Sequence, residues 1–156
     1  MDEKLKNLLD QESELQFSRF DEDIAWKIGS QLWERAKSEK LPITIDITRG
    51  AQQLFHASRR GTSADNDEWV KRKIRLVYRF GHSSYYMGQL LKSMGKTIEE
   101  AFLIPECDYA PHGGCFPIFI KGAGIVGAIT VSGLVQEEDH CIVVEAIRSY
   151  LSQEDQ

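Results

Sequence analysis

The sequence lacks the features that mark several large classes of protein. No apolar run approaches membrane-spanning length, and the opening MDEKLKNLLDQESE is acidic without an apolar stretch. We therefore expect no secretory signal, no membrane contact and a cytoplasmic location. Lysine and arginine number 19 against 24 aspartates and glutamates, which gives a net charge of -5. A chain without basic excess is not expected to bind nucleic acid.

Cysteine is scarce, with three residues and no C-x-x-C pair, which predicts reduced thiols. Cys107, His112 and Cys115 could form part of a zinc site, completed by His140 or Cys141 from a distant segment. Structural zinc sites use four ligands at more regular spacing, so we predict no metal site. The sequence also lacks a Ser/His/Asp signature and a P-loop lysine motif, and no catalytic residue is assigned.

The remaining composition is that of a globular protein: 42% of the 156 residues are hydrophobic and 28% are charged. No repeat, low-complexity tract or linker interrupts the chain. We therefore predict a single domain over residues 1–156.

Hydrophobic periodicity predicts alternating helices and strands. Between residues 42 and 48, three isoleucines alternate with Thr44, Asp46 and Thr48, as in a half-buried strand. Asp65 or Asn66 is expected to cap a helix that is interrupted near Gly81. The other predicted helices cover residues 3–12, 21–40, 97 onward and 137–150, and the other strands cover 14–20, 51–58, 115–120 and 125–135.

A formal G-x-G-x-x-G occurs in KGAGIVGAI at residues 121–129. A dinucleotide-binding site requires a helix that begins inside this motif. Here the glycines are followed by β-branched residues typical of a strand. The segment therefore predicts a hairpin turn that binds no nucleotide.

Two segments combine residue types suited to a ligand. Trp69, Arg72 and Lys73 share one side of a predicted helix and would suit a planar or anionic molecule. His112 precedes Gly113 and Gly114, whose backbone a ligand could approach closely. The alternatives are a Trp packed in the core or an interface, and a tight entry into the next strand.

A third candidate pair is Asp139 and His140, in the first turn of the last helix, where the helix dipole should favour a neutral imidazole. These two side chains could instead only satisfy backbone groups of that turn. Trp26 and Trp33 lie seven residues apart on another predicted helix and add apolar surface, which predicts a homo-oligomer.

Four stretches in this order resemble a known family: DNDEWVKRK (65–73), HGGCFPI (112–118), VGAITVSGL (126–134) and EDH (138–140). The chain is similar to the haem-degrading domain family, which includes HbpS, GlcG and the C-terminal domain of PduO. It most resembles the bacterial and yeast branch classed as an uncharacterised protein family. The similarity covers residues 13–151, so residues 1–12 are interpreted as an N-terminal extension.

This resemblance implies an α/β (α+β) sandwich, with a mostly antiparallel sheet of about five strands and helices packed on it. It also implies a homo-oligomer, and it makes haem a candidate cofactor because some relatives bind it.

The leading hypothesis for function is a module that binds a small anionic or planar ligand, haem among the candidates. Alternatives are an oligomeric scaffold without a ligand and, third, an enzyme that uses His112 or His140 as acid and base. The predicted ligand site comprises Trp69, Arg72, Lys73, His112, Gly113, Gly114, Asp139 and His140.

Overall fold

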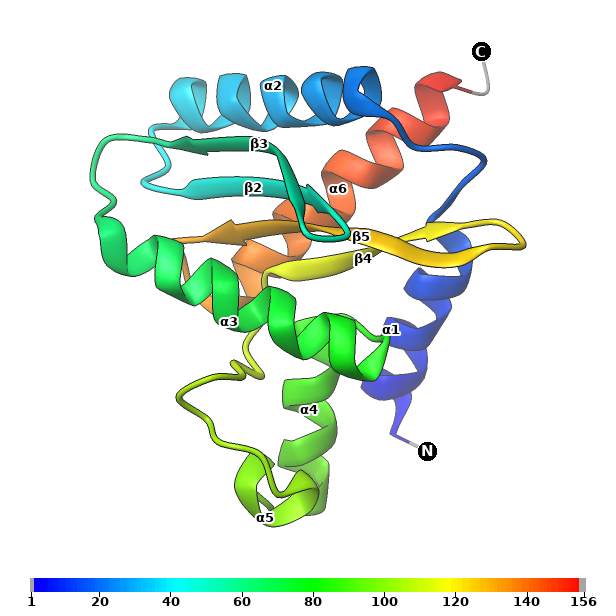
Figure 1. Ribbon diagram of the computed structural model, residues 1–156, viewed down its shortest axis with the longest axis vertical. Coiled ribbons are helices and arrows are strands. Elements are labelled where there is room, and N and C mark those ends of the chain that lie inside the picture. Colours follow the sequence, from blue (N-terminus) through cyan, green and yellow to red (C-terminus); the bar gives the residue numbers. More distant parts are fainter. Residues whose placement is uncertain (1, 155–156) are drawn as a thin grey trace.

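The computed structural model describes residues 2–154, in which helices cover both faces of one mixed sheet (Figure 1). The helices are α1 (Glu3–Glu14), α2 (Glu22–Glu39), α3 (Ala64–Phe80), α4 (Ser84–Met94), α5 (Ile98–Phe102) and α6 (Gln136–Glu154). The strands are β1 (Gln16–Phe17), β2 (Thr44–Arg49), β3 (Gln52–Ser58), β4 (Cys115–Ile120) and β5 (Gly124–Ser132). No helix within residues 2–154 is both long and apolar enough to cross a bilayer.

The strands are ordered β1-β4-β5-β2-β3. All neighbouring pairs are antiparallel except β1 with β4. The predicted mostly antiparallel five-stranded sheet is therefore confirmed, with one parallel pair at its edge. The predicted hairpin turn at KGAG is also confirmed, because antiparallel strands β4 and β5 flank it and no helix begins there.

The main core lies between the sheet and helices α2 and α6. Ile43, Ile45 and Ile47 belong to this core. Helix α3 covers the opposite face of the sheet, where it packs on β2, β4 and β5. As a result Thr44 and Asp46 are also buried, and the prediction of a half-buried strand was wrong. Alternation identified the strand, but the polar face meets a helix instead of water.

The start of α3 also differs from the prediction. Ser63, not Asp65 or Asn66, is the N-cap residue. Its side chain accepts a hydrogen bond from a backbone N–H of the first turn, and Asn66 reaches back to the backbone N–H of Ser63. This reciprocal capping box leaves the side chain of Asp65 at the surface.

Helices α1, α4 and α5 contribute to a second cluster of buried residues, below the sheet in Figure 1. Leu5 and Leu8 of α1 belong to it, and Glu12 contacts the backbone N–H of Ser83 at the start of α4. The predicted boundary between an extension and the domain falls inside α1, which packs against α4. The predicted single domain remains a prediction.

His56 on β3 bridges the sheet to α3. Its Nδ1 lies 2.8 Å from Oδ2 of buried Asp46, and its Nε2 lies 2.8 Å from Oδ1 of Asp67. Carboxylates only accept hydrogen bonds, so both contacts are made at once only when both ring nitrogens carry hydrogen. Burial opposes the charge, but the hydrogen bonds to Asp46 and Asp67 raise the pKa of His56.

Protonated His56 is expected to stabilise the fold in a pH-dependent way. Because its pKa is raised on folding, its contribution is fully present below the unfolded pKa, about 6.5, and is lost as pH rises through the folded pKa. Urea unfolding of the wild type and His56→Gln between pH 5.5 and pH 8.5 measures this difference. The stability gap between them should narrow as pH rises; a gap that stays constant would contradict the charged bridge.

Candidate functional site

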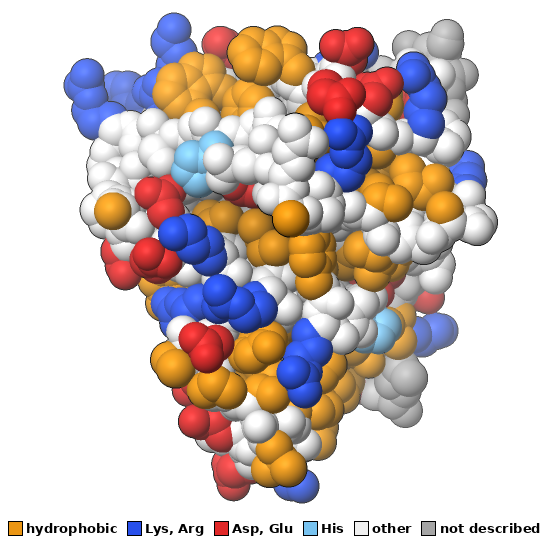
Figure 2. Space-filling model, in the orientation of Figure 1, with side chains coloured by type: hydrophobic (Ala, Val, Ile, Leu, Met, Phe, Trp, Pro, Cys, Tyr) orange, Lys and Arg blue, Asp and Glu red, His pale blue; other side chains and the backbone are white. Residues whose placement is uncertain are grey.

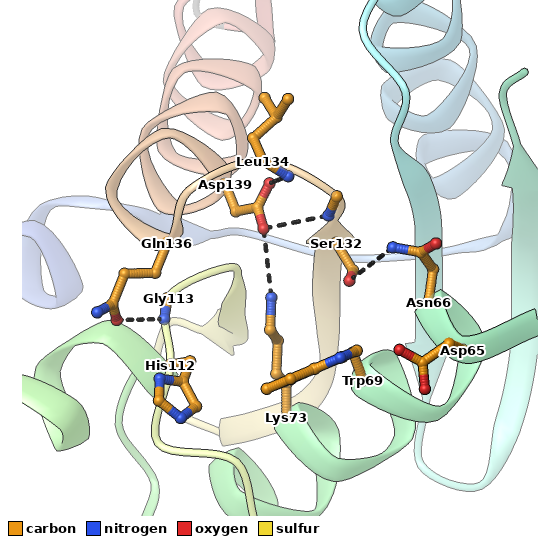
Figure 3. Close-up of a pocket in the computed structure, with 11 residues that line it drawn as sticks. Asp65, Asn66, Trp69, Lys73, His112, Gly113, Ser132, Leu134, Gln136 and Asp139 are labelled. Carbon is orange, nitrogen blue, oxygen red and sulfur yellow. Dashed lines mark hydrogen bonds and ion pairs between the residues drawn. The ribbon is translucent and has the colours of Figure 1, made fainter. Parts of the chain in front are cut away.

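The segments singled out in the sequence meet in one pocket of about 330 Å³ beside the C-terminal end of β5 (Figure 3). Helix α3, the loop before β4, the end of β5 and the start of α6 each contribute to its wall. The lining residues are Asp65, Asn66, Trp69, Lys73, His112, Gly113, Ser132, Gly133, Leu134, Gln136 and Asp139.

An ion pair forms the inner wall. The Nζ of Lys73 lies 3.4 Å from Oδ2 of Asp139 and donates to the carbonyl oxygen of Val131 at 3.2 Å. Asp139 also accepts hydrogen bonds from the backbone N–H groups of Gly133 and Leu134, at 3.3 and 3.0 Å. The first turn of α6 is thus tied to the turn that leaves β5.

Both members of the pair are almost fully buried. Burial raises the pKa of Asp139 to about 6, against the opposing effect of Lys73 and two backbone N–H donors. Burial likewise lowers the pKa of Lys73, against the attraction of Asp139. Desolvation therefore brings the two pKa values closer together than they are in water, which eases proton exchange between the groups.

Trp69 and His112 form the outer wall, with ring centroids 5.5 Å apart and a T-shaped arrangement. His112 is partly exposed, and its Nε2 lies 4.0 Å from a carboxylate oxygen of Glu106. Burial lowers the pKa of His112, and the charges of Lys73 and Arg72 act in the same direction against Glu106. The imidazole is therefore mainly neutral at pH 7.

Four residues outside the predicted site complete the polar lining: Asp65, Asn66, Ser132 and Gln136. Gln136 accepts a hydrogen bond from the backbone N–H of Gly113 at 3.1 Å, which joins α6 to the loop. Ser132 accepts one from the Asn66 amide at 3.4 Å. Residue types alone did not indicate that Gln136 faces the same space as Ser132.

Five of the eight predicted site residues line the pocket: Trp69, Lys73, His112, Gly113 and Asp139. Gly114 lies directly behind it, because a Cβ there would be 2.6 Å from Nζ of Lys73. Arg72 does not line the pocket; its guanidinium lies 4.1 Å from the centroid of the Trp69 ring.

His140 also lies outside the pocket, with its ring tilted against those of Tyr85 and Phe116 in the interior. Its Nε2 bonds to Oε1 of Gln11 at 2.9 Å, and burial lowers its pKa to about 4. The structure therefore brings Asp139 to the candidate site and directs His140 toward α1 and α4.

Metal-binding geometry is not found among residues 2–154, where no three His, Cys, Asp or Glu side chains cluster suitably. Cys107 and Cys141 are exposed and Cys115 is buried, each as a free thiol. Cys107 and Cys115, which were considered together as zinc ligands, therefore lie in different environments, one at the surface and one in the interior.

Comparison with known proteins identifies the family. The family described as "Haem degrading protein HbpS-like" matches residues 20–148. A UPF0303 protein of Streptomyces coelicolor is 47% identical over 146 residues, covering 94% of this chain and 92% of the relative. A UPF0303 protein of Psychromonas ingrahamii is 48% identical over 143 residues, covering 92% and 90%.

Solved structures agree with this assignment. The Ybr137w protein has a TM-score of 0.90 at 34% identity, covering 97% of this chain and 90% of that one. A PduOC:haem complex has a TM-score of 0.69 at 15% identity, covering 83% and 94%. The second likeness shows the fold alone. The chain belongs to the HbpS-like family, and the resemblance predicted from sequence is confirmed.

Proposed function

We propose that this member of the HbpS-like family is a binding protein for a small polar ligand that occupies the pocket between Trp69 and Lys73. The convergence of four separate chain segments on one pocket of about 330 Å³ carries this proposal. Pockets that combine an aromatic wall with a few convergent polar groups are typical ligand sites.

The charge of the lining favours a polar ligand over a strongly anionic one. Lys73 is the basic residue of the lining, and Asp139 already pairs with it. Asp65 adds a further acidic group at the rim, while the guanidinium of Arg72 lies over Trp69. Hydrogen-bonding groups of Asn66 and Ser132 suit hydroxyl, amide or carbonyl groups of a ligand.

Ligand binding is expected to change the fluorescence of Trp69. In a Trp26→Phe, Trp33→Phe background Trp69 is the remaining tryptophan, so titration with glycerol, dihydroxyacetone, acetamide, pyruvate or phosphate reports on this pocket. We expect saturable changes with neutral polar probes and weaker ones with phosphate. Ser132→Ala should weaken binding several-fold, by loss of a hydrogen bond worth about 1 kcal/mol. A flat response to every probe would refute the binding proposal.

Haem is a second candidate ligand, favoured by the family description and the fold shared with a PduOC:haem complex. The rim supplies suitable groups: His112 would hold the iron and Arg72 a propionate, through a charge-assisted hydrogen bond. The buried ion pair of Lys73 and Asp139 makes the inner part of the pocket unsuited to an apolar macrocycle. Haem would therefore fit at the rim of the pocket. Bound haem would supply redox and oxygen chemistry to this site.

Haemin titration separates the two candidates. If haem binds at the rim, the Soret band should shift saturably, and His112→Ala should abolish the shift while Arg72→Ala weakens it. His140→Gln should leave the shift unchanged, because His140 faces the interior away from the pocket. Equal shifts in the wild type and His112→Ala would exclude this site for haem.

We further propose that the chain assembles with copies of itself through a groove between α2 and β3. Trp26, Trp33 and Phe55 help to line this groove of about 520 Å³, and Trp26 is 67% exposed. Figure 2 shows hydrophobic side chains grouped over α2 at the top of the molecule. Strand β3 is the sheet edge beside this groove, and a second copy offers a matching edge strand.

Light scattering should give a mass of two or more chains of 17.8 kDa each. Trp26→Asp is expected to reduce the mass toward one chain, since it places a charge in an apolar contact. Leu103→Asp is the matched control, because Leu103 is 88% exposed on the distant α4–α5 side. A wild-type mass of one chain at micromolar concentration would rule out this assembly.

A further inference from the structure

The amine of Lys73 occupies an unusual position. Lys73 extends from α3 toward β5, and its side chain is only 4% exposed, yet it lines the pocket. Nζ makes two contacts among the described residues, with the Val131 carbonyl and the Asp139 carboxylate. A lysine amine carries three hydrogens when charged, so one position on Nζ has no protein partner there.

A glycine packs closely against this amine. Gly114 faces Nζ so closely that a Cβ would lie 2.6 Å from it. Gly114 has a φ of +136°, a conformation that residues with side chains rarely adopt. Glycine therefore occupies a position where any side chain would displace the amine.

The rest of the pocket suits a hydroxylated molecule. Asn66, Ser132 and Gln136 place amide and hydroxyl groups around the space, and Trp69 supplies a flat apolar wall. Such a combination can bind several hydroxyl groups on one side and the C–H groups of the same ligand on the other.

We propose that Lys73 is a nucleophile that condenses with a small polyhydroxylated aldehyde or ketone held in this pocket. The proposal rests on the pocket being a small-ligand site, and it specifies the class of ligand and the bond formed. A buried lysine is suited to this chemistry because desolvation favours the uncharged amine, and the neighbouring carboxyl group of Asp139 can exchange protons with it.

The reaction is a condensation that needs no oxidant or reductant. The lone pair of uncharged Nζ forms a bond to the carbonyl carbon, and one proton moves from the nitrogen to the carbonyl oxygen to give a carbinolamine. The oxygen then takes up a second proton, the carbon–oxygen bond breaks and water leaves, and the nitrogen loses its remaining proton to yield the imine. Asp139, 3.4 Å from Nζ, accepts the proton from nitrogen and returns one to the departing oxygen.

Reductive trapping tests this assignment. Purified protein is incubated at pH 7 with dihydroxyacetone and sodium cyanoborohydride, and modified lysines are mapped by peptide mass spectrometry. Lys71, two residues away on the same helix and with its side chain 63% exposed, is the internal reference. We expect labelling of Lys73 to exceed that of Lys71 several-fold, because the pocket holds the carbonyl compound beside the Lys73 amine. In urea the ratio should fall to about one.

Two further measurements test the role of Asp139 in proton transfer and the need for an unoccupied pocket. Asp139→Asn should slow labelling of Lys73 without changing Lys71, and excess glycerol should protect Lys73 by competition. The comparison of Lys73 with Lys71 is made within the wild-type protein, so it does not depend on the folding of any variant. Labelling of Lys71 with Lys73 unmodified would overturn the proposal.

The outcome also separates this inference from the binding proposal. If dihydroxyacetone and glycerol change Trp69 fluorescence equally and Lys73 is never labelled, the pocket binds ligands but Lys73 is not a nucleophile. If neither compound changes the fluorescence and Lys73 is not labelled, both proposals fail.

Discussion

Asp139→Ala is expected to destabilise the protein by about 3–5 kcal/mol, the usual effect of removing one partner of a buried ion pair. The substitution leaves the Lys73 amine in the interior with only the Val131 carbonyl as a contact. It also removes the acceptor for the backbone N–H groups of Gly133 and Leu134. Urea unfolding followed by circular dichroism measures the change.

A double variant measures how much of this loss in stability comes from leaving one charge unpaired. Lys73→Met with Asp139→Leu should lose less stability than Asp139→Ala alone, since replacing both charges by apolar groups leaves no unpaired charge. Glu138→Ala, at the exposed neighbouring position, should change stability by less than about 0.5 kcal/mol. Strict additivity of the Lys73 and Asp139 single changes would show that the two groups do not interact.

Gly114→Ala is expected to cost about 3 kcal/mol or more, from backbone strain and overpacking together. Its φ of +136° is unfavourable for alanine, and the added Cβ would meet both the Val131 carbonyl oxygen and the Lys73 amine. Thermal unfolding gives the loss in stability, and Trp69 fluorescence reports whether the pocket is deformed.

Gly95→Ala is the matched control for this prediction. Gly95 also has a positive φ, +64°, but no atom lies within 4 Å of an added Cβ. Only the cost of the left-handed conformation remains, about 1–2 kcal/mol. If the two substitutions destabilise the protein equally, crowding at Gly114 is not important.

Residues that share one face of a helix were easier to place together from the sequence than residues that are neighbours in the chain. Trp69 and Lys73 are four apart, so one helix presents both to the same space. Asp139 and His140 are neighbours, and successive helical residues point about 100° apart. The two side chains therefore face different surroundings: Asp139 meets Lys73, whereas His140 meets Gln11.

Contacts between distant segments could not be predicted from local patterns. The alternation in residues 43–47 identified β2, but only the placement of α3 shows that Asp46 is buried. Arg72 belongs to the predicted ligand site, yet its guanidinium packs on the Trp69 ring and does not line the pocket. These outcomes depend on tertiary packing, which overrides the preferences of single residues.

The parallel pair at the sheet edge has a consequence for synthesis on the ribosome. Strand β1 is made early, but its register pairs Gln16 with Phe119 and Phe17 with Ile120. Such non-local contacts form only after the intervening chain is available. Phe17, fully buried in the finished protein, must therefore remain unpaired while most of the chain is translated. The strand that emerges first is among the last to find its partner.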